Sequence, residues 1–187
     1  MPWRGLGRRL VICCELAHFF GRLYRKKAMK GFVMKNLPIA IIGGGPVGLA
    51  AVAHLLERGE DPLLFEAADT IGAHIRDWAH VRMFSPWEFT VDGATVRLLE
   101  QNGWQMPPAD ALPTGGDLLA QYMQPFAALP QVAPHIRTGA RVQAVTRRDI
   151  DKLKDSGRDD APFLLHVVYS DGREDLIEAR AVIDASG

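Results

Sequence analysis

Three glycines and one acidic residue stand at a spacing that suits the binding of a dinucleotide. Gly43, Gly45 and Gly48 form a G-x-G-x-x-G pattern, and Glu66 lies 23 residues after the first of them. Such glycines permit a tight turn, the approach of a diphosphate to the backbone, and close packing of a helix. The acid accepts hydrogen bonds from ribose hydroxyls and repels a 2′-phosphate, so the pattern predicts FAD or NAD in preference to NADP.

The flanking residues predict the elements that position these groups. An apolar run over 39–42 predicts a strand, a helical pattern follows the glycines, and a second apolar run over 63–65 predicts a parallel strand ending at Glu66. The diphosphate would lie at the helix N-terminus, where free N–H groups and the helix dipole favour an anion. A βαβ turn without a ligand is the alternative.

Charge divides the chain into two unlike parts. Of its 187 residues 48% are hydrophobic and 24% charged, which is typical of a globular protein of one domain or slightly more. The net charge is zero, but residues 1–35 carry +8 and the remainder −8. We expect a basic N-terminal extension over 1–36, disordered or not native, and a folded domain over 37–187. No nucleic-acid partner is expected.

The extension has an apolar run over 10–20 that superficially resembles a secretory signal. Glu15 and His18 interrupt it, no cleavage site follows, and it is too short to span a bilayer. A basic helix on a membrane surface is the alternative, but a cytoplasmic protein is expected. Cys13 and Cys14 are the two cysteines, so the domain lacks the cysteine pair of a metal site or of a disulfide reductase.

Residues 67–87 are too irregular for one element and are expected to form a loop that crosses the cofactor. The polar side chains that would meet it, each with a solvated surface position as its alternative, are His74, Arg76, His80, Arg82 and Ser85. Two histidines six residues apart, without a further ligand, do not make a metal site.

The remaining patterns predict two helices, a meander and a last strand. Helical spacing covers 91–102 and 116–129, where Pro125 predicts a kink or an early stop. Alternation then predicts three antiparallel strands over 142–147, 163–169 and 174–179, with a solvated acidic loop at 149–160. The apolar residues from 179 onward predict a strand in the middle of a parallel sheet.

This order of elements resembles the FAD domain of the glutathione-reductase-like flavoproteins. The resemblance covers residues 37–187, and residues 42–72 look most like the flavin-dependent monooxygenases and related NAD(P)H-dependent enzymes. It implies an α/β fold with a central parallel sheet and a three-stranded antiparallel meander. It also implies FAD at these positions: Gly43, Gly45, Pro46, Val47, Gly48, Glu66, the backbone of Val142, and Gly187 near the pyrophosphate or flavin.

Two departures from these relatives are visible. They commonly have Gly-Gly after the acid and Ala-Thr-Gly after the last strand, whereas this chain has Gly72-Ala73 and Ala185-Ser186-Gly187. The relatives also carry a second glycine-rich motif for NADPH beyond that strand. We therefore expect the chain to be the first part of a longer enzyme, incomplete at its C-terminus.

The resemblance implies an FAD-dependent oxidoreductase, flavin monooxygenase-like, with NAD(P)H as reductant and a small molecule as substrate. No catalytic residue is identified. Alternatives are another FAD oxidoreductase of the amine oxidase or quinone reductase type, and a non-catalytic nucleotide-binding module or inactive fragment. An NAD-only dehydrogenase fits less well, because such a domain continues βαβ where this chain turns antiparallel.

Overall fold

A computed structural model describes residues 36–150 and 157–187. The predicted basic extension lies outside these residues except for Asn36, and so does the middle of the acidic loop at 149–160. Within the described ranges, no helix is long and apolar enough to cross a bilayer.

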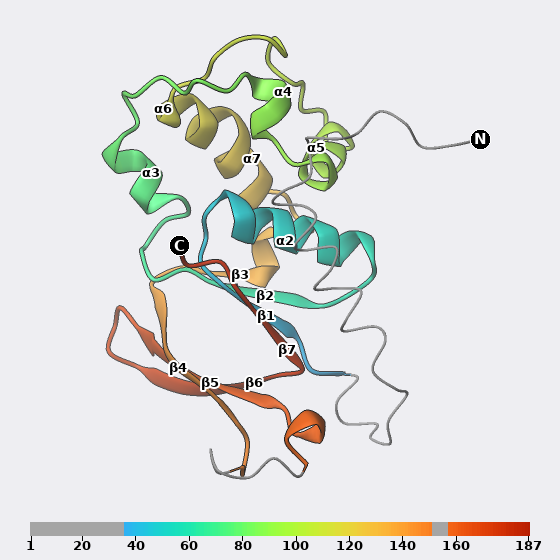
Figure 1. The fold of residues 1–187 in the computed structure, drawn as a ribbon, viewed down its shortest axis with the longest axis vertical. Coiled ribbons are helices and arrows are strands. Elements are labelled where there is room, and N and C mark those ends of the chain that lie inside the picture. The colour runs from blue at the N-terminus through green and yellow to red at the C-terminus, as the bar shows by residue number, and fades with distance from the viewer. Residues whose placement is uncertain (1–35, 151–156) are drawn as a thin grey trace, which may run out of the picture. The chain divides into compact units, whose positions relative to one another are not determined.

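A parallel sheet of four strands forms the centre of the domain (Figure 1). Its strands are β1 (Ile39–Ile42), β2 (Pro62–Phe65), β3 (Ile136–Arg137) and β7 (Ala181–Asp184), in the order β3-β2-β1-β7. The first two strands were predicted, whereas β3, which pairs with β2, was not. The prediction for β7 is wrong in position: β7 is the outermost described strand on its side, because β1 takes the place between it and β2.

Helix α2 (Pro46–Glu57) covers one face of this sheet. Proline is favourable at the first position, where its missing N–H would have no partner within the helix, and three alanines and three leucines or valines follow at buried positions. After the helix the chain takes a left-handed conformation at Gly59, with φ +68°. Leu49, Val52 and Leu55 are buried, so α2 is held by packing on the sheet and on the helices beyond it.

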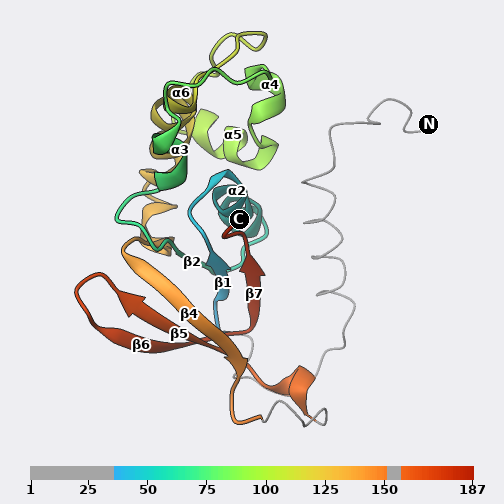
Figure 2. The same ribbon diagram turned by 60° about the vertical axis from the view of Figure 1, so that its left-hand side comes forward.

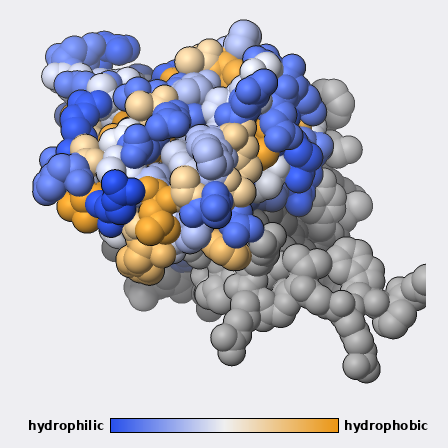
Figure 3. All heavy atoms as spheres, turned by 90° about the horizontal axis from the view of Figure 1, so that it is seen from above, coloured by the Kyte–Doolittle hydropathy of each residue, from blue (hydrophilic) through white to orange (hydrophobic). Residues whose placement is uncertain are grey.

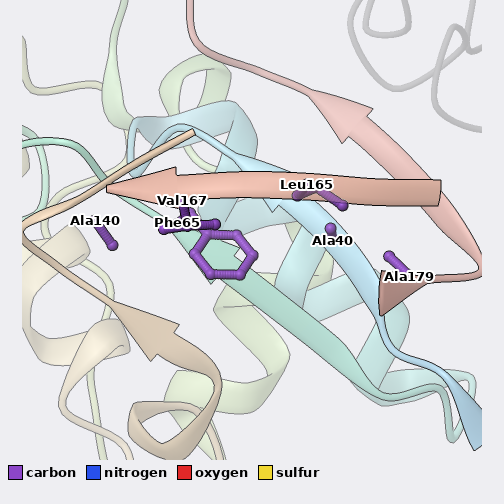
Figure 4. Packing of buried hydrophobic residues seen from close by; sticks show 6 residues of the cluster. All are labelled: Ala40, Phe65, Ala140, Leu165, Val167 and Ala179. Atoms are coloured by element: carbon purple, nitrogen blue, oxygen red, sulfur yellow. The ribbon is translucent and has the colours of Figure 1, made fainter. Parts of the chain in front are cut away.

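The antiparallel meander covers the opposite face (Figure 2). It consists of β4 (Ala140–Arg147), β5 (Phe163–Tyr169) and β6 (Glu174–Ala179), paired in that order, and a short 3₁₀ turn, η4 (Arg158–Asp160), precedes β5. The three predicted strands are thereby confirmed. Figure 4 shows the cluster that joins the meander to the parallel sheet, formed by Ala40, Phe65, Ala140, Leu165, Val167 and Ala179.

Residues 73–127 form a helical insert on the α2 side of the sheet. Its elements are α3 (Ala73–Asp77), α4 (Trp87–Thr90), α5 (Gly93–Glu100), α6 (Gly115–Leu118), η2 (Leu119–Met123) and α7 (Gln124–Ala127), followed by η3 (Ala133–His135). Residues 104–113, between the two main helical segments, form no helix or strand. Seen from above, the molecule carries apolar residues scattered among hydrophilic ones (Figure 3).

Two polar contacts fasten the insert to α2. The guanidinium of Arg97 donates to both carboxylate oxygens of Glu57, at 2.7 and 2.8 Å, which lowers the pKa of Glu57. His54 lies 3.0 Å from a carboxylate oxygen of Asp92, the residue that caps α5. The insert and the helix after the glycines therefore form one packed layer.

The second predicted helix does not stop at Pro125, because α7 continues to Ala127. It widens into the π-helical turn η2, in which the N–H of Gln124 donates to the carbonyl of Leu119. Pro125 has no N–H for the carbonyl of Gln121 four residues earlier, and that carbonyl instead accepts from the indole of Trp104 at 2.6 Å. The helix thus continues past Pro125 through a π-helical turn, and the indole N–H of Trp104 satisfies the carbonyl of Gln121.

Candidate functional site

The glycine turn lies where β1, β2 and β7 end together. The N–H of Gly43 donates to the carbonyl of Phe65 at 2.8 Å, and that of Ala185 donates to the carbonyl of Ile42 at 2.8 Å. Gly43 has φ +106°, and an added Cβ would lie 2.5 Å from the carbonyl oxygen of Ala185. The turn therefore needs glycine here both for its backbone conformation and for the close approach of the chain after β7.

The other two glycines of the motif differ in their surroundings. A Cβ on Gly48 would lie 1.9 Å from the carbonyl oxygen of Gly43, so this glycine lets α2 begin directly against the turn. A Cβ on Gly45 would meet no protein atom within 4 Å. Packing explains Gly48, whereas the space beside Gly45 is available to a ligand.

The N-terminus of α2 is suited to an anion. Gly45 is its capping residue and has no side chain to accept a hydrogen bond from the first amides, and the first turn of α2 has no acidic residue. The first N–H groups of a helix have no partner within the helix, and the dipole places partial positive charge at this end. Pro46 and Val47 stand at this end of the helix, and their contact with a diphosphate stays a prediction.

Glu66 points toward the glycine turn. One carboxylate oxygen accepts from the N–H of Gly44 at 2.6 Å, and the other accepts from the N–H of Ala68 at 2.8 Å. Each oxygen can accept a further hydrogen bond, and the side chain is only partly buried. The carboxylate thus stands beside the turn with room to accept further hydrogen bonds, and its contact with a ribose stays a prediction.

Gly44 and Gly72 belong to this arrangement, and the sequence analysis did not identify either as a site residue. Gly44 donates to Glu66, and its own carbonyl accepts from the N–H of Gly72 at 3.0 Å. A Cβ on Gly44 would lie 2.7 Å from Ile71 and 2.8 Å from Glu66. The three consecutive glycines were a signal for Gly44, but only the folded structure shows its partners.

The structure places Arg82 in the helical insert. Arg82 forms a β-bridge with Thr114, and its guanidinium donates to the carbonyl of Leu112 at 3.3 Å. The hydrogen bonds seen for it thus join the two long connections of the insert, and none of them leads to the glycine turn. A role of Arg82 at the cofactor stays a prediction.

Val142 lies in β4, and Gly187 lies in the segment that follows β7. Val142 is in β4 opposite Val167, just before a β-bulge, and the start of β4 is tied to the acid because Ala140 donates to the carbonyl of Glu66 at 2.8 Å. Gly187 follows β7, with φ +85°. Figure 1 shows this end of the chain close to the start of α2. Their contacts with a cofactor stay predictions.

Among the described residues, no group of three or more acidic, histidine or cysteine side chains is placed to hold a metal.

Comparison with known proteins agrees with this geometry. Residues 41–103 match the family described as the NAD(P)-binding Rossmann-like domain. This chain has a Rossmann-like nucleotide-binding fold. The matched range contains the glycine turn, α2, β2 and Glu66. A comparison with curated protein sequences gave no match.

Several solved structures resemble this fold over most of the chain. Bacillithiol disulfide reductase Bdr from Bacillus cereus is 24% identical, with a TM-score of 0.59 over 81% of this chain. OTEMO in complex with FAD and NADP is 17% identical, with a TM-score of 0.57 over 82%. Oxidized steroid monooxygenase bound to NADP is 21% identical, with a TM-score of 0.57 over 81%. The chain spans 40% of the reductase and 26% of each of the other two proteins.

Proposed function

We propose that this chain is the FAD-binding part of an FAD-dependent oxidoreductase. The observation that carries the proposal is the placement of Glu66 beside a glycine turn whose Gly45 leaves open space. The first amides of α2 would hold the pyrophosphate, and the carboxylate of Glu66 would accept hydrogen bonds from the adenosine ribose. A 2′-phosphate would be repelled by the same carboxylate.

The meander favours FAD over NAD as the resident cofactor. A plain NAD-binding domain continues with further βαβ units, whereas β4, β5 and β6 are antiparallel and pack under the sheet. The chain returns from the meander into β7, which brings Ala185 to the turn. Two of the proteins with a similar fold are described as bound to FAD and NADP or to NADP.

For the whole enzyme we propose a flavin monooxygenase-like reaction on a small molecule, with NAD(P)H as reductant. FAD, when bound, supplies the redox chemistry, and the protein binds it, orients it and excludes water. The likeness to OTEMO and steroid monooxygenase, of which this chain spans 26%, supports this type. Another FAD oxidoreductase, of the amine oxidase or quinone reductase type, is the alternative.

The absorbance spectrum of the purified chain after loading with FAD tests the proposal. Flavin that stays with the protein through gel filtration is expected, and its loss would contradict FAD binding. Anaerobic addition of NADPH or NADH then separates two outcomes. Bleaching supports a complete reductase function in this chain, whereas a flavin spectrum that neither nucleotide bleaches supports a nucleotide-binding module that depends on further protein for reduction.

A further inference from the structure

The peptide groups on both sides of Gly44 are held by the segment that follows β2. Its N–H donates to Glu66 at 2.6 Å, and its carbonyl accepts from the N–H of Gly72 at 3.0 Å. Both bonds end on Gly44, so a shift of Gly72 would displace the Gly44 carbonyl and change the dihedral angles of Gly44 that set the direction of its N–H. The donor that orients the Glu66 carboxylate would then move as well.

Gly72 is itself fixed by the helical insert. It has φ +66°, a conformation that residues with a Cβ rarely adopt. An added Cβ would lie 2.4 Å from Leu119 and 3.1 Å from Met123, two buried side chains of the π-helical turn η2. The insert therefore packs directly on the residue that holds the carbonyl of Gly44.

From this chain of contacts we infer that Gly72 is a positioning residue for ribose recognition. Gly72 holds the carbonyl of Gly44 and thereby fixes the backbone of Gly44. The N–H of Gly44 then keeps the carboxylate of Glu66 in the orientation that accepts the ribose hydroxyls. The inference rests on the proposed function, in which Glu66 binds the ribose. It gives the helical insert a part in cofactor recognition, although the insert lies outside the glycine motif.

The test compares the affinities of the full chain for ADP and for 2′,3′-dideoxy-ADP by isothermal titration calorimetry. The ratio of the two dissociation constants measures how much the ribose hydroxyls contribute to affinity. The dissociation constant of the dideoxy compound measures binding at the diphosphate site without them. Hydrogen bonds to a carboxylate correspond to a preference for ADP of about tenfold or more in the unaltered chain. For Gly72→Ala we expect the preference to fall below about threefold, with the affinity for the dideoxy compound changed by less than about threefold.

Gly103→Ala is the matched control. Gly103 also has a positive φ, +83°, but an added Cβ there meets nothing within 4 Å. The variant thus has the same kind of backbone strain without a collision, and we expect it to keep the full preference. Equal losses in both variants would show a general effect of strain and would overturn the inference.

A second variant removes only the hydrogen bond. Replacing Gly72 by glycolic acid through nonsense suppression exchanges its N–H for an oxygen and adds no side chain. We expect this ester to lose the preference for ADP as well, and it carries the test if Gly72→Ala does not fold. An ester variant that keeps the tenfold preference would overturn the inference while leaving the proposed function intact. Absence of ADP binding in the unaltered chain would contradict the proposed function itself.

Discussion

Gly45 is the residue at which a substitution should lower ligand binding without lowering the stability of the fold. An added side chain meets no protein atom, yet it would occupy the space beside the first amides of α2. We therefore expect Gly45→Val to fold as the unaltered chain does and to lose at least about 90% of its FAD binding, as after loss of about 1.4 kcal/mol of binding free energy. Far-UV circular dichroism and the flavin absorbance retained after gel filtration measure the two properties.

The control for this variant is Gly93→Val. Gly93 is the first residue of α5, and its added Cβ would come no closer than 3.4 Å to the flexible side chain of Arg97. Flavin binding should be unchanged in it. If Gly45→Val kept its flavin, the diphosphate would have to lie elsewhere.

Gly48 should behave in the opposite way. A Cβ there would lie 1.9 Å from the backbone oxygen of Gly43, so α2 must move away from the turn. We expect Gly48→Ala to lower the free energy of unfolding by about 1–3 kcal/mol, as overpacked sites do. Urea unfolding in the absence of any nucleotide measures this, and an unchanged midpoint would contradict the packing role assigned to Gly48.

At the scale of elements, the segment from α6 to α7 starts with a capping box. The carboxylate of Asp117 accepts from the backbone N–H of Thr114 at 2.8 Å and from its hydroxyl at 2.7 Å. These bonds hold the pKa of Asp117 below its ordinary value. A carboxyl whose pKa is lower in the folded state stabilises the protein at neutral pH, and this contribution disappears as the pH falls through that pKa.

Asp117→Asn should therefore reduce stability in a pH-dependent way. We expect a loss of about 1 kcal/mol in the free energy of unfolding near pH 7, typical of a lost cap, and a smaller difference near pH 3. Urea unfolding followed by circular dichroism at both pH values measures it. Asp110→Asn, at an exposed position before α6, should stay within about 0.5 kcal/mol of the unaltered chain. A loss in Asp117→Asn that is the same at both pH values would rule out the carboxylate as its source.

The whole domain depends on the packing of the meander against the parallel sheet. Leu165 of β5 is fully buried in the shared cluster, whereas Leu176 of the neighbouring strand β6 is 65% exposed on the outer face. We expect Leu165→Ala to lower the free energy of unfolding by about 2–5 kcal/mol and Leu176→Ala to change it by less than about 0.5 kcal/mol. Urea unfolding of the two variants tests this, and similar losses would contradict the assignment of the inner face.

Much of this architecture was predictable because it depends on short-range sequence patterns, namely apolar runs, alternation and glycine spacing. Strands β1, β5 and β6 have the predicted residues, since an apolar run before glycines and strict alternation each have one regular interpretation. The same holds for the glycine spacing and for Glu66, whose distance along the chain reflects one βαβ unit. Local sequence by itself determined these strands and the presence of an acid at the end of β2, beside the glycine turn.

Only the tertiary structure decided which distant segments meet. The two residues of β3 are too few to form a pattern, Pro125 is accommodated by a π-turn that Trp104 completes, and Arg82 pairs within the insert. The contact of Gly72 with Leu119 likewise joins residues of separate elements. Such contacts depend on how whole elements pack, and packing joins residues that no short-range spacing relates.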